Sequence, residues 1–247
     1  MKLAALAFCW TRSQVSWGVR RHHNHRGNLL VDNNWLSLWT TWHNMLLGHG
    51  AVVQALRVEP PALARDVGAV EARLGRRIPA SLRAVLLTFS REVHFQWFLD
   101  DGPAEPRQLK DLSRFGELHW SLDSLKRLRS EDEDAEDDID MYGETGAQLL
   151  RHTMIFQEVA NGDALAVDWR SGEVVYLDHE GGLANGIVLG ASFAKFVSAY
   201  SAVGCAGPDS EQLRGILDEW SINPRTPIAE SWRAWIGLPL RHREKPG

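Results

Sequence analysis

Five acidic or imidazole side chains beside two predicted strands are of the types that perform acid–base chemistry. Asp163 and Asp168 border one short apolar run, and Asp178, His179 and Glu180 follow the next run. If these runs are adjacent strands, the side chains could gather at one end of the sheet, where a carboxylate and an imidazole can transfer protons. Residues at hairpin ends usually bond to the turn or to solvent, so we expect no catalysis here and predict that the protein is not an enzyme.

Other sequence signatures of catalysis or metal binding do not occur in the chain. There is no phosphate-binding G-x-x-x-x-G-K-[ST], no dinucleotide-binding G-x-G-x-x-G and no G-x-S-x-G nucleophile turn. His179 and Glu180 begin like a zinc-protease helix, but Leu183 stands where the second ligand histidine would be needed. Cys205 has no basic neighbours in the sequence to lower its pKa. We therefore predict no catalytic residues, no metal ion, no cofactor and no small-molecule substrate.

Composition limits the remaining classes of protein. The chain has 247 residues with 44% hydrophobic and 24% charged residues, which excludes wholesale disorder, collagen and coiled-coil rods. No apolar run reaches the roughly 18 residues that a membrane-spanning helix needs. A net charge of −5 gives no basic footprint for nucleic acid. The two cysteines, Cys9 and Cys205, fit a reducing compartment, so we expect a cytoplasmic protein without membrane or nucleic-acid partners.

The first 50 residues differ from the rest, because they hold five of the 11 tryptophans and five of the ten histidines. Three interpretations are open. Residues 3–10 could be the apolar part of a secretion signal, and residues 22–25, which include three histidines, could bind zinc or nickel. We favour the third, in which residues 1–50 are a poorly folded extension or Met45 is the true start.

Helical and strand periodicity begins after Pro60 and Pro61. Apolar residues at i, i+4, i+7 and i+11 predict a helix that ends at Gly75, and these residues are Leu63, Val67, Val70 and Leu74. Pro79 begins a second helix, whose apolar residues are Leu82, Val85, Leu86 and Phe89. Residues 93–99 and 117–122 alternate as strands, and a short helix follows to Leu128.

The segment 153–179 has the strongest structural pattern. Three apolar runs are joined by the tight turns 160–163 and 170–172, so an antiparallel meander of three strands is predicted. Ser192 can cap a last helix whose apolar face is formed by Phe193, Phe196, Val197 and Tyr200. This succession predicts an α+β domain over residues 51–204.

Two further segments flank or interrupt this domain. Residues 205–247 carry two short amphipathic stripes, around Leu213 to Trp220 and Ile228 to Ile236, and should form a helical tail that folds back on the domain as a lid. Residues 131–140 hold eight acidic side chains in ten positions. Such a run is typical of a solvated loop, but it could also meet a basic partner by electrostatic attraction.

Four segments together resemble the SUKH superfamily, the Smi/Knr-like proteins. They are the E-x-x-L-G-x-x-[LI]-P junction at 71–79, the N-G-D hairpin at 160–168, the strand segment 172–180 and the S-F-x-x-F helix within 189–196. The residues that carry the match are Glu71, Gly75, Pro79, Asn161, Gly162, Asp163, Ser192, Phe193 and Phe196. The resemblance implies an antiparallel or mixed sheet of about six strands flanked by helices, and no catalytic set.

The resemblance also implies a function in protein binding. Many bacterial members resemble immunity proteins that neutralise toxins, often nucleases, while fungal members act in cell-wall signalling. We therefore predict an immunity-type protein, with a regulatory scaffold in cell-wall or signalling assemblies as the alternative. The candidate partner-binding residues are an aromatic anchor and acidic groups: Trp97, Asp100, Asp101, Glu131, Asp132, Glu133, Asp134, Asp178, His179 and Glu180. For Trp97, burial in the core is the competing interpretation.

Overall fold

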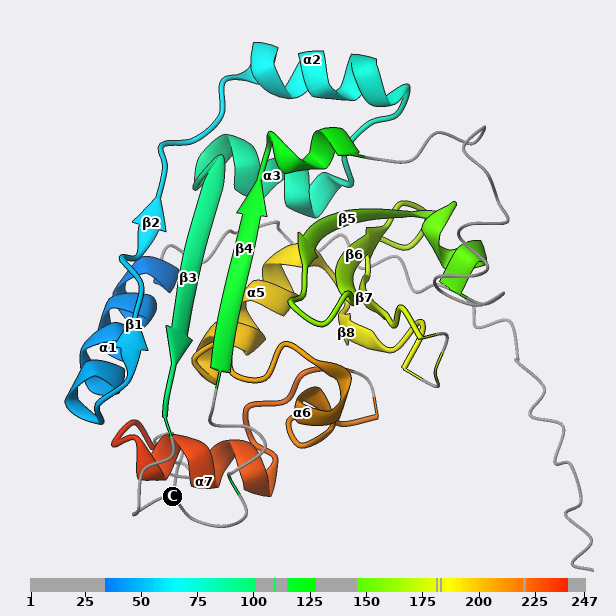
Figure 1. Ribbon diagram of the computed structural model, residues 1–247. Coiled ribbons are helices and arrows are strands. Elements are labelled where there is room, and N and C mark those ends of the chain that lie inside the picture. Colours follow the sequence, from blue (N-terminus) through cyan, green and yellow to red (C-terminus); the bar gives the residue numbers. More distant parts are fainter. Residues whose placement is uncertain are drawn as a thin grey trace, which may run out of the picture.

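The first sheet is built around one long central strand (Figure 1). The computed structural model describes residues 34–100, 109, 115–127, 146–180, 182, 184–219 and 221–239. In the sheet, β3 (Glu92–Phe98) pairs along its whole length with β4 (Phe115–Ser121). Its other edge pairs with the short strands β1 (Val52–Val53) and β2 (Arg57–Val58). All these pairings are antiparallel.

The second sheet has four antiparallel strands in chain order: β5 (Thr153–Glu158), β6 (Ala164–Asp168), β7 (Val174–Leu177) and β8 (Val188–Gly190). The predicted three-strand meander is confirmed, and β8 extends it by one strand. Gly162 has φ 99°, the left-handed region that the predicted Asn-Gly turn requires. The α+β class is also confirmed, although the strands form two sheets of four and not one of about six.

Three helices of the predicted domain form for the expected local reasons. α2 (Ala64–Leu74) ends at Gly75 with φ 63°, and α3 (Ala80–Thr88) starts directly after Pro79. The Glu71 carboxylate joins them, because it accepts hydrogen bonds from the Ile78 N–H at 3.1 Å and from Arg83 Nε at 3.1 Å. In α5 (Phe193–Ala202), the hydroxyl of Ser192 accepts a hydrogen bond from Lys195 N–H. Val67, Val70, Leu82, Val85, Phe193 and Phe196 are buried, whereas Leu63 is exposed.

The amino-terminal segment corrects the sequence-based expectation of a poorly folded extension to residue 50. Residues Trp35–Gly48 form helix α1, which contacts α5. One face of this helix is buried in the main core, and its Trp35 and Trp39 indoles donate hydrogen bonds to Ser198 Oγ at 2.9 Å and Ser201 Oγ at 2.8 Å. Residues 1–33, which include the histidine cluster at 22–25, lie outside the described residues.

The carboxy-terminal segment also belongs to the main core and is more than a lid. α6 (Ser210–Arg214) is shorter than the stripe predicted, while α7 (Pro227–Trp235) carries the buried Trp232. The Trp232 ring stacks on Trp42 of α1 at 5.7 Å and on Trp97 of β3 at 5.6 Å. Within the described residues, the larger of two core clusters includes side chains of α1, both sheets and α7, so both α1 and α7 pack against the predicted domain.

Candidate functional site

The outward face of the first sheet carries mostly half-buried and exposed side chains among the described residues. Strict alternation along β3 and β4 sends apolar side chains inward, where α3 and α5 lie behind the strands (Figure 1). The other half of each strand faces outward. Across this face the paired residues are Glu92 with Ser121, His94 with His119, Gln96 with Glu117, and Phe98 with Phe115.

This outward face changes character along the strands. Arg57 of β2 pairs with His94 and continues the polar rows, whereas Val52 of β1 pairs with Phe98 at the other end. Val52 is 69% exposed and Phe98 48% exposed. Aromatic and aliphatic side chains beside charged groups are typical of protein-binding surfaces. The face thus offers an apolar patch next to a polar one.

Burial disfavours the protonated form of the two histidines in the middle of the polar rows. Their rings lie 5.3 Å apart, and both are half-buried. Burial lowers the pKa of His94, and burial together with the neighbouring His94 lowers the pKa of His119. The unfolded chain therefore binds more protons than the folded one just below the ordinary pKa of 6.5, so stability falls as the pH decreases through that region.

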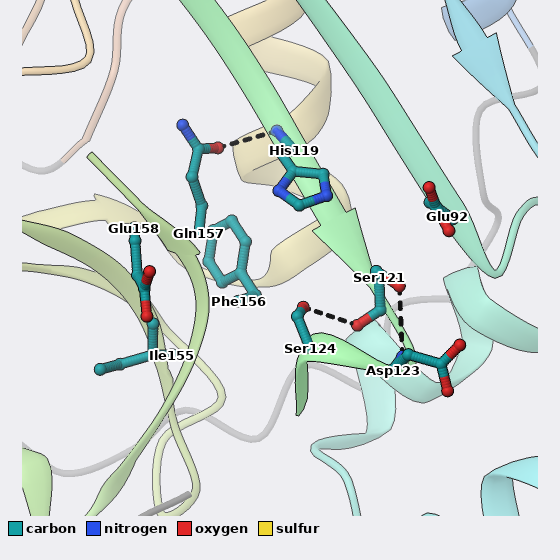
Figure 2. A pocket seen from close by; sticks show the side chains of 9 residues that line it. All are labelled: Glu92, His119, Ser121, Asp123, Ser124, Ile155, Phe156, Gln157 and Glu158. Atoms are coloured by element: carbon teal, nitrogen blue, oxygen red, sulfur yellow. Dashed lines mark hydrogen bonds between the residues drawn. The ribbon is translucent and has the colours of Figure 1, made fainter. Parts of the chain in front are cut away.

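A groove of about 480 Å³ separates β4 from β5, the facing strands of the two sheets (Figure 2). It is lined by Glu92, His119, Ser121, Asp123, Ser124, Ile155, Phe156, Gln157 and Glu158. Asp123 lies in the turn that follows β4, and Ser124 is the first residue of the 3₁₀-helix η2 (Ser124–Arg127). The buried Gln157 side chain crosses between the sheets, since its Oε1 accepts a hydrogen bond from the His119 N–H at 2.9 Å.

Carboxylates dominate the charge of this groove. Among the described residues, its lining includes Glu92, Asp123 and Glu158 but no lysine or arginine. Two arginines stand at its border: Arg57 Nη1 lies 3.2 Å from Glu92 Oε1, and Arg91 Nη2 lies 3.2 Å from Asp123 Oδ2. Three acidic groups against neutral histidines and two bordering arginines give a negative potential, which attracts basic groups.

The second cluster lies where the meander turns, and it brings together part of the set predicted from the sequence. Asp163 Oδ1 accepts hydrogen bonds from His179 N at 2.9 Å and lies 2.7 Å from His179 Nδ1. Its other oxygen accepts hydrogen bonds from Asn161 Nδ2 and the Tyr176 hydroxyl. Asp168 lies at the opposite end of β6, where it pairs with Arg170, so the gathering of all five residues at one end was wrong.

A metal ion is poorly suited to this cluster, although Asp163, Asp178 and His179 offer ligand atoms within 4.8 Å of one another. Both oxygens of Asp163 already accept hydrogen bonds, and an ion would have to displace those donors. Buried polar atoms with a full set of partners are typical of a structural role. We interpret the cluster as a lock that fixes the β5–β6 turn to the segment after β7.

The lock makes stability depend on pH in two opposite directions. Burial raises the pKa of Asp163, but the hydrogen bonds from Tyr176, His179 and Asn161 outweigh burial and lower it below 3.8. The hydrogen bond to Asp163 raises the pKa of His179 above 6.5. Asp163 therefore contributes stability above pH 3.8 that is lost as the pH falls through its folded pKa. His179 contributes stability below pH 6.5 that is lost as the pH rises through its folded pKa.

We expect His179→Gln to remove the alkaline part of this dependence. The measurement is the free energy of unfolding in urea at several pH values between 5.5 and 9. As the pH rises over this range, the wild-type value should decrease by up to about 1 kcal/mol more than that of the variant. The difference is small because the imidazole is partly exposed to solvent. The control is His152→Gln, at the other end of the second sheet, which should keep the wild-type slope. Equal slopes for wild type and His179→Gln would contradict the lock.

The structure separates the residues that the sequence proposed for partner binding. Trp97 is 0% exposed and donates a hydrogen bond from Nε1 to the Gly204 carbonyl at 2.7 Å, so it is a core residue and the prediction of a surface anchor is corrected. Asp100 is exposed after the end of β3, at the far end from the groove. Asp178 and His179 are half-buried in the lock, and Glu180 is exposed beside them. Asp101, Glu131, Asp132, Glu133 and Asp134 lie outside the described residues, as does the whole run 131–140.

The polar residues of β3 and β4 were missed by sequence reasoning. Apolar alternation predicts both strands but assigns no role to the complementary positions. The usable signal was the matching pattern Glu92, His94, Gln96 and Glu117, His119, Ser121. Two strands of the same sheet with polar residues at every second position predict one solvent-facing polar surface.

These features define an α+β protein in which, among the described residues, one face of the first sheet carries partly exposed polar and apolar side chains and a groove lined by three carboxylates lies beside it. The family model described as SMI1 / KNR4 family (SUKH-1) matches residues 61–199, more than half of the chain. The chain therefore belongs to this family, which includes toxin-immunity proteins. No curated protein matches the chain. Of the described helices, none is long and apolar enough to span a membrane.

Proposed function

We propose that this protein is a non-enzymatic immunity protein that neutralises a bacterial toxin by binding it directly. The supporting observation is the acidic groove beside an open sheet face. Glu92, Asp123 and Glu158 can attract a basic toxin domain, such as that of a nuclease. The exposed Val52 and Phe98 can then supply the apolar contacts that hold it.

The arrangement favours binding over catalysis for a physical reason. The carboxylates of Glu92 and Asp123 are already paired with Arg57 and Arg91, which favours a fixed charge over proton transfer. Such groups give a fixed pattern of charge and hydrogen bonds. A partner with complementary lysines and arginines would be recognised at a rate and affinity that decrease with salt.

The test is binding to the toxin encoded beside this protein, measured by calorimetry at low and high salt. Replacing two groove carboxylates, Glu92→Gln with Glu158→Gln, should weaken binding about tenfold or more, or about 1.4 kcal/mol. Its dependence on salt should also decrease. The matched control is Glu230→Gln on α7, at the other end of the molecule from η2, which should bind like wild type (Figure 1).

Two outcomes would contradict the proposal. Toxin binding that is insensitive to salt and unchanged in the double variant would remove the role of the groove. A solitary locus without any toxin-like neighbour would favour the regulatory scaffold instead. A separate variant that replaces the acids of residues 131–140 with their amides tests whether that run contributes to the attraction.

A further inference from the structure

The free edge of β4 points to how a partner is held. We propose that the groove binds an extended, lysine- or arginine-bearing segment of the partner, which adds to β4 as a strand at Ser121. This inference rests on the proposed function and names the part of the partner that enters the groove. In strand addition, main-chain hydrogen bonds give affinity and alternate side chains give specificity.

The edge of β4 away from β3 already accepts strand-like partners at its start. The Glu117 N–H donates to the Cys205 carbonyl at 2.9 Å, and the Gly207 N–H donates to the Phe115 carbonyl at 2.9 Å. Ala206, between these two partners, forms an antiparallel bridge with Gly116. This end of the edge is therefore covered by the segment that follows α5.

In the middle of the edge, a side chain takes the place of a strand. Gln157 Oε1 accepts a hydrogen bond from the His119 N–H at 2.9 Å, and its Nε2 donates to the Glu117 carbonyl at 3.4 Å. An amide that offers one donor and one acceptor reproduces what a peptide group of a neighbouring strand would offer. Gln157 thus ends the covered part of the edge where the groove begins (Figure 2).

The next main-chain groups on the same edge are the His119 carbonyl and the Ser121 N–H. Strand alternation places them there, since the N–H groups of Glu117 and His119 point to this edge and the Leu122 N–H instead donates to the Arg91 carbonyl beside β3. Among the described residues, nothing forms a hydrogen bond with this carbonyl or this N–H. The Ser121 carbonyl on this edge already accepts a hydrogen bond from the Ser124 hydroxyl at 2.8 Å, so the His119 carbonyl and the Ser121 N–H are the groups that an added strand could use.

The lining selects the chemistry of that strand. Ile155 and Phe156 provide apolar surface on the β5 side, while Glu92, Asp123 and Glu158 provide negative charge. A segment that alternates apolar and basic residues can satisfy both at once, because successive side chains of a strand point to opposite faces. An acidic segment, such as this chain's own residues 131–140, would meet like charge in the groove.

The probe is a blocked heptapeptide of alternating lysine and valine. We expect it to bind the full chain in calorimetry and, at saturation, to slow hydrogen exchange of the Ser121 amide about tenfold or more, measured by NMR, because that N–H gains an acceptor. An analogue with N-methyl groups on the backbone nitrogens that face β4 should bind at least about tenfold more weakly. A peptide with glutamate in place of lysine should not bind.

Two protein variants make the result specific to the groove. Ser124→Trp fills the groove and also removes the hydrogen bond from the Ser124 hydroxyl to the Ser121 carbonyl, whereas Glu92→Gln with Glu158→Gln removes charge without adding bulk. Both variants should weaken peptide binding, and Glu230→Gln should not. If Ser124→Trp does not fold, the double variant and the hydrogen exchange of the Ser121 amide still test whether the peptide adds to β4 as a strand. No binding of the lysine peptide, equal binding of its N-methyl analogue, or unchanged Ser121 exchange would overturn strand addition. A toxin that still binds wild type under any of those results would leave the proposed function standing.

Discussion

Replacing Trp232 with alanine is expected to lower the free energy of unfolding by about 3–5 kcal/mol, the range for a large aromatic residue removed from a core. The Trp232 ring is fully buried and is stacked between two other indoles, Trp42 at an interplanar angle of 11° and Trp97 at 16°. These rings come from α7, α1 and β3, so the substitution removes contacts that join the two ends of the chain to the first sheet.

A second loss adds to the missing ring. Trp232 Nε1 donates a hydrogen bond to the Val203 carbonyl at 2.9 Å, at the end of α5. Alanine removes this indole donor and leaves the Val203 carbonyl with only the longer hydrogen bond from the Ala206 N–H at 3.4 Å, which adds part of the roughly 1–3 kcal/mol cost of an unpaired buried group. The cost of the cavity and the cost of the lost donor are not fully additive. We therefore expect a loss of unfolding free energy in the upper half of the range of about 3–5 kcal/mol.

The measurement is urea denaturation of the full chain, with Trp235→Ala as the matched control. Trp235 lies on the same helix with its ring 5.6 Å from Trp232, but it is half-buried and contacts His49 at the border of the core. Its loss should cost about 1 kcal/mol, as for a typical substitution. Equal costs for the two variants would show that the stacked indoles are not central to stability.

The part of the fold that could be predicted from sequence is the part fixed by short-range signals. Gly75 and Gly162 adopt the positive φ angles that their motifs require, and Ser192 caps α5 with its own side chain. Each of these depends on backbone geometry within a few residues. The order of α2, α3, β3, β4, β5, β6, β7 and α5 followed from such signals together with apolar periodicity, whereas the short strand β8 was not predicted.

The amino-terminal helix was missed although its signal is present. Trp35, Trp39, Trp42 and Leu46 stand at i, i+4, i+7 and i+11, the same spacing that predicted α2. The high tryptophan and histidine content of the first 50 residues masks this helical spacing. In the structure, these four side chains are the buried face of α1.

The groove could not be predicted, because its position depends on contacts between distant segments. Gln157 bonds to β4 residues 38 and 40 positions earlier, and Glu117 bonds to Cys205. Local propensity carries no information about which strand edge is covered by a glutamine and which stays open. The lock at Asp163 has the same origin, since Tyr176 and His179 approach it only after the meander has formed.

Removing residues 1–44 is expected to abolish cooperative folding, whereas removing residues 1–33 should leave it intact. The shorter truncation keeps α1, and the core contacts that the structure describes begin at Trp35. The longer one starts the chain at Met45 and deletes three fully buried indoles. Each such loss costs about 3–5 kcal/mol. The three losses together are as large as most or all of the roughly 5–15 kcal/mol that stabilises a folded domain.

The physical reason lies in what α1 covers. Trp39 contacts Phe89 at 5.8 Å and Trp120 at 6.1 Å, so without α1 the inner side of the first sheet and one side of α5 would be exposed to water. The buried Ser201 hydroxyl would lose its indole donor as well. Near-ultraviolet circular dichroism and urea denaturation of both truncated chains are the measurements. A chain starting at Met45 that unfolds cooperatively, with the stability of the chain starting at residue 34, would show that α1 is dispensable and would restore the boundary near residue 50.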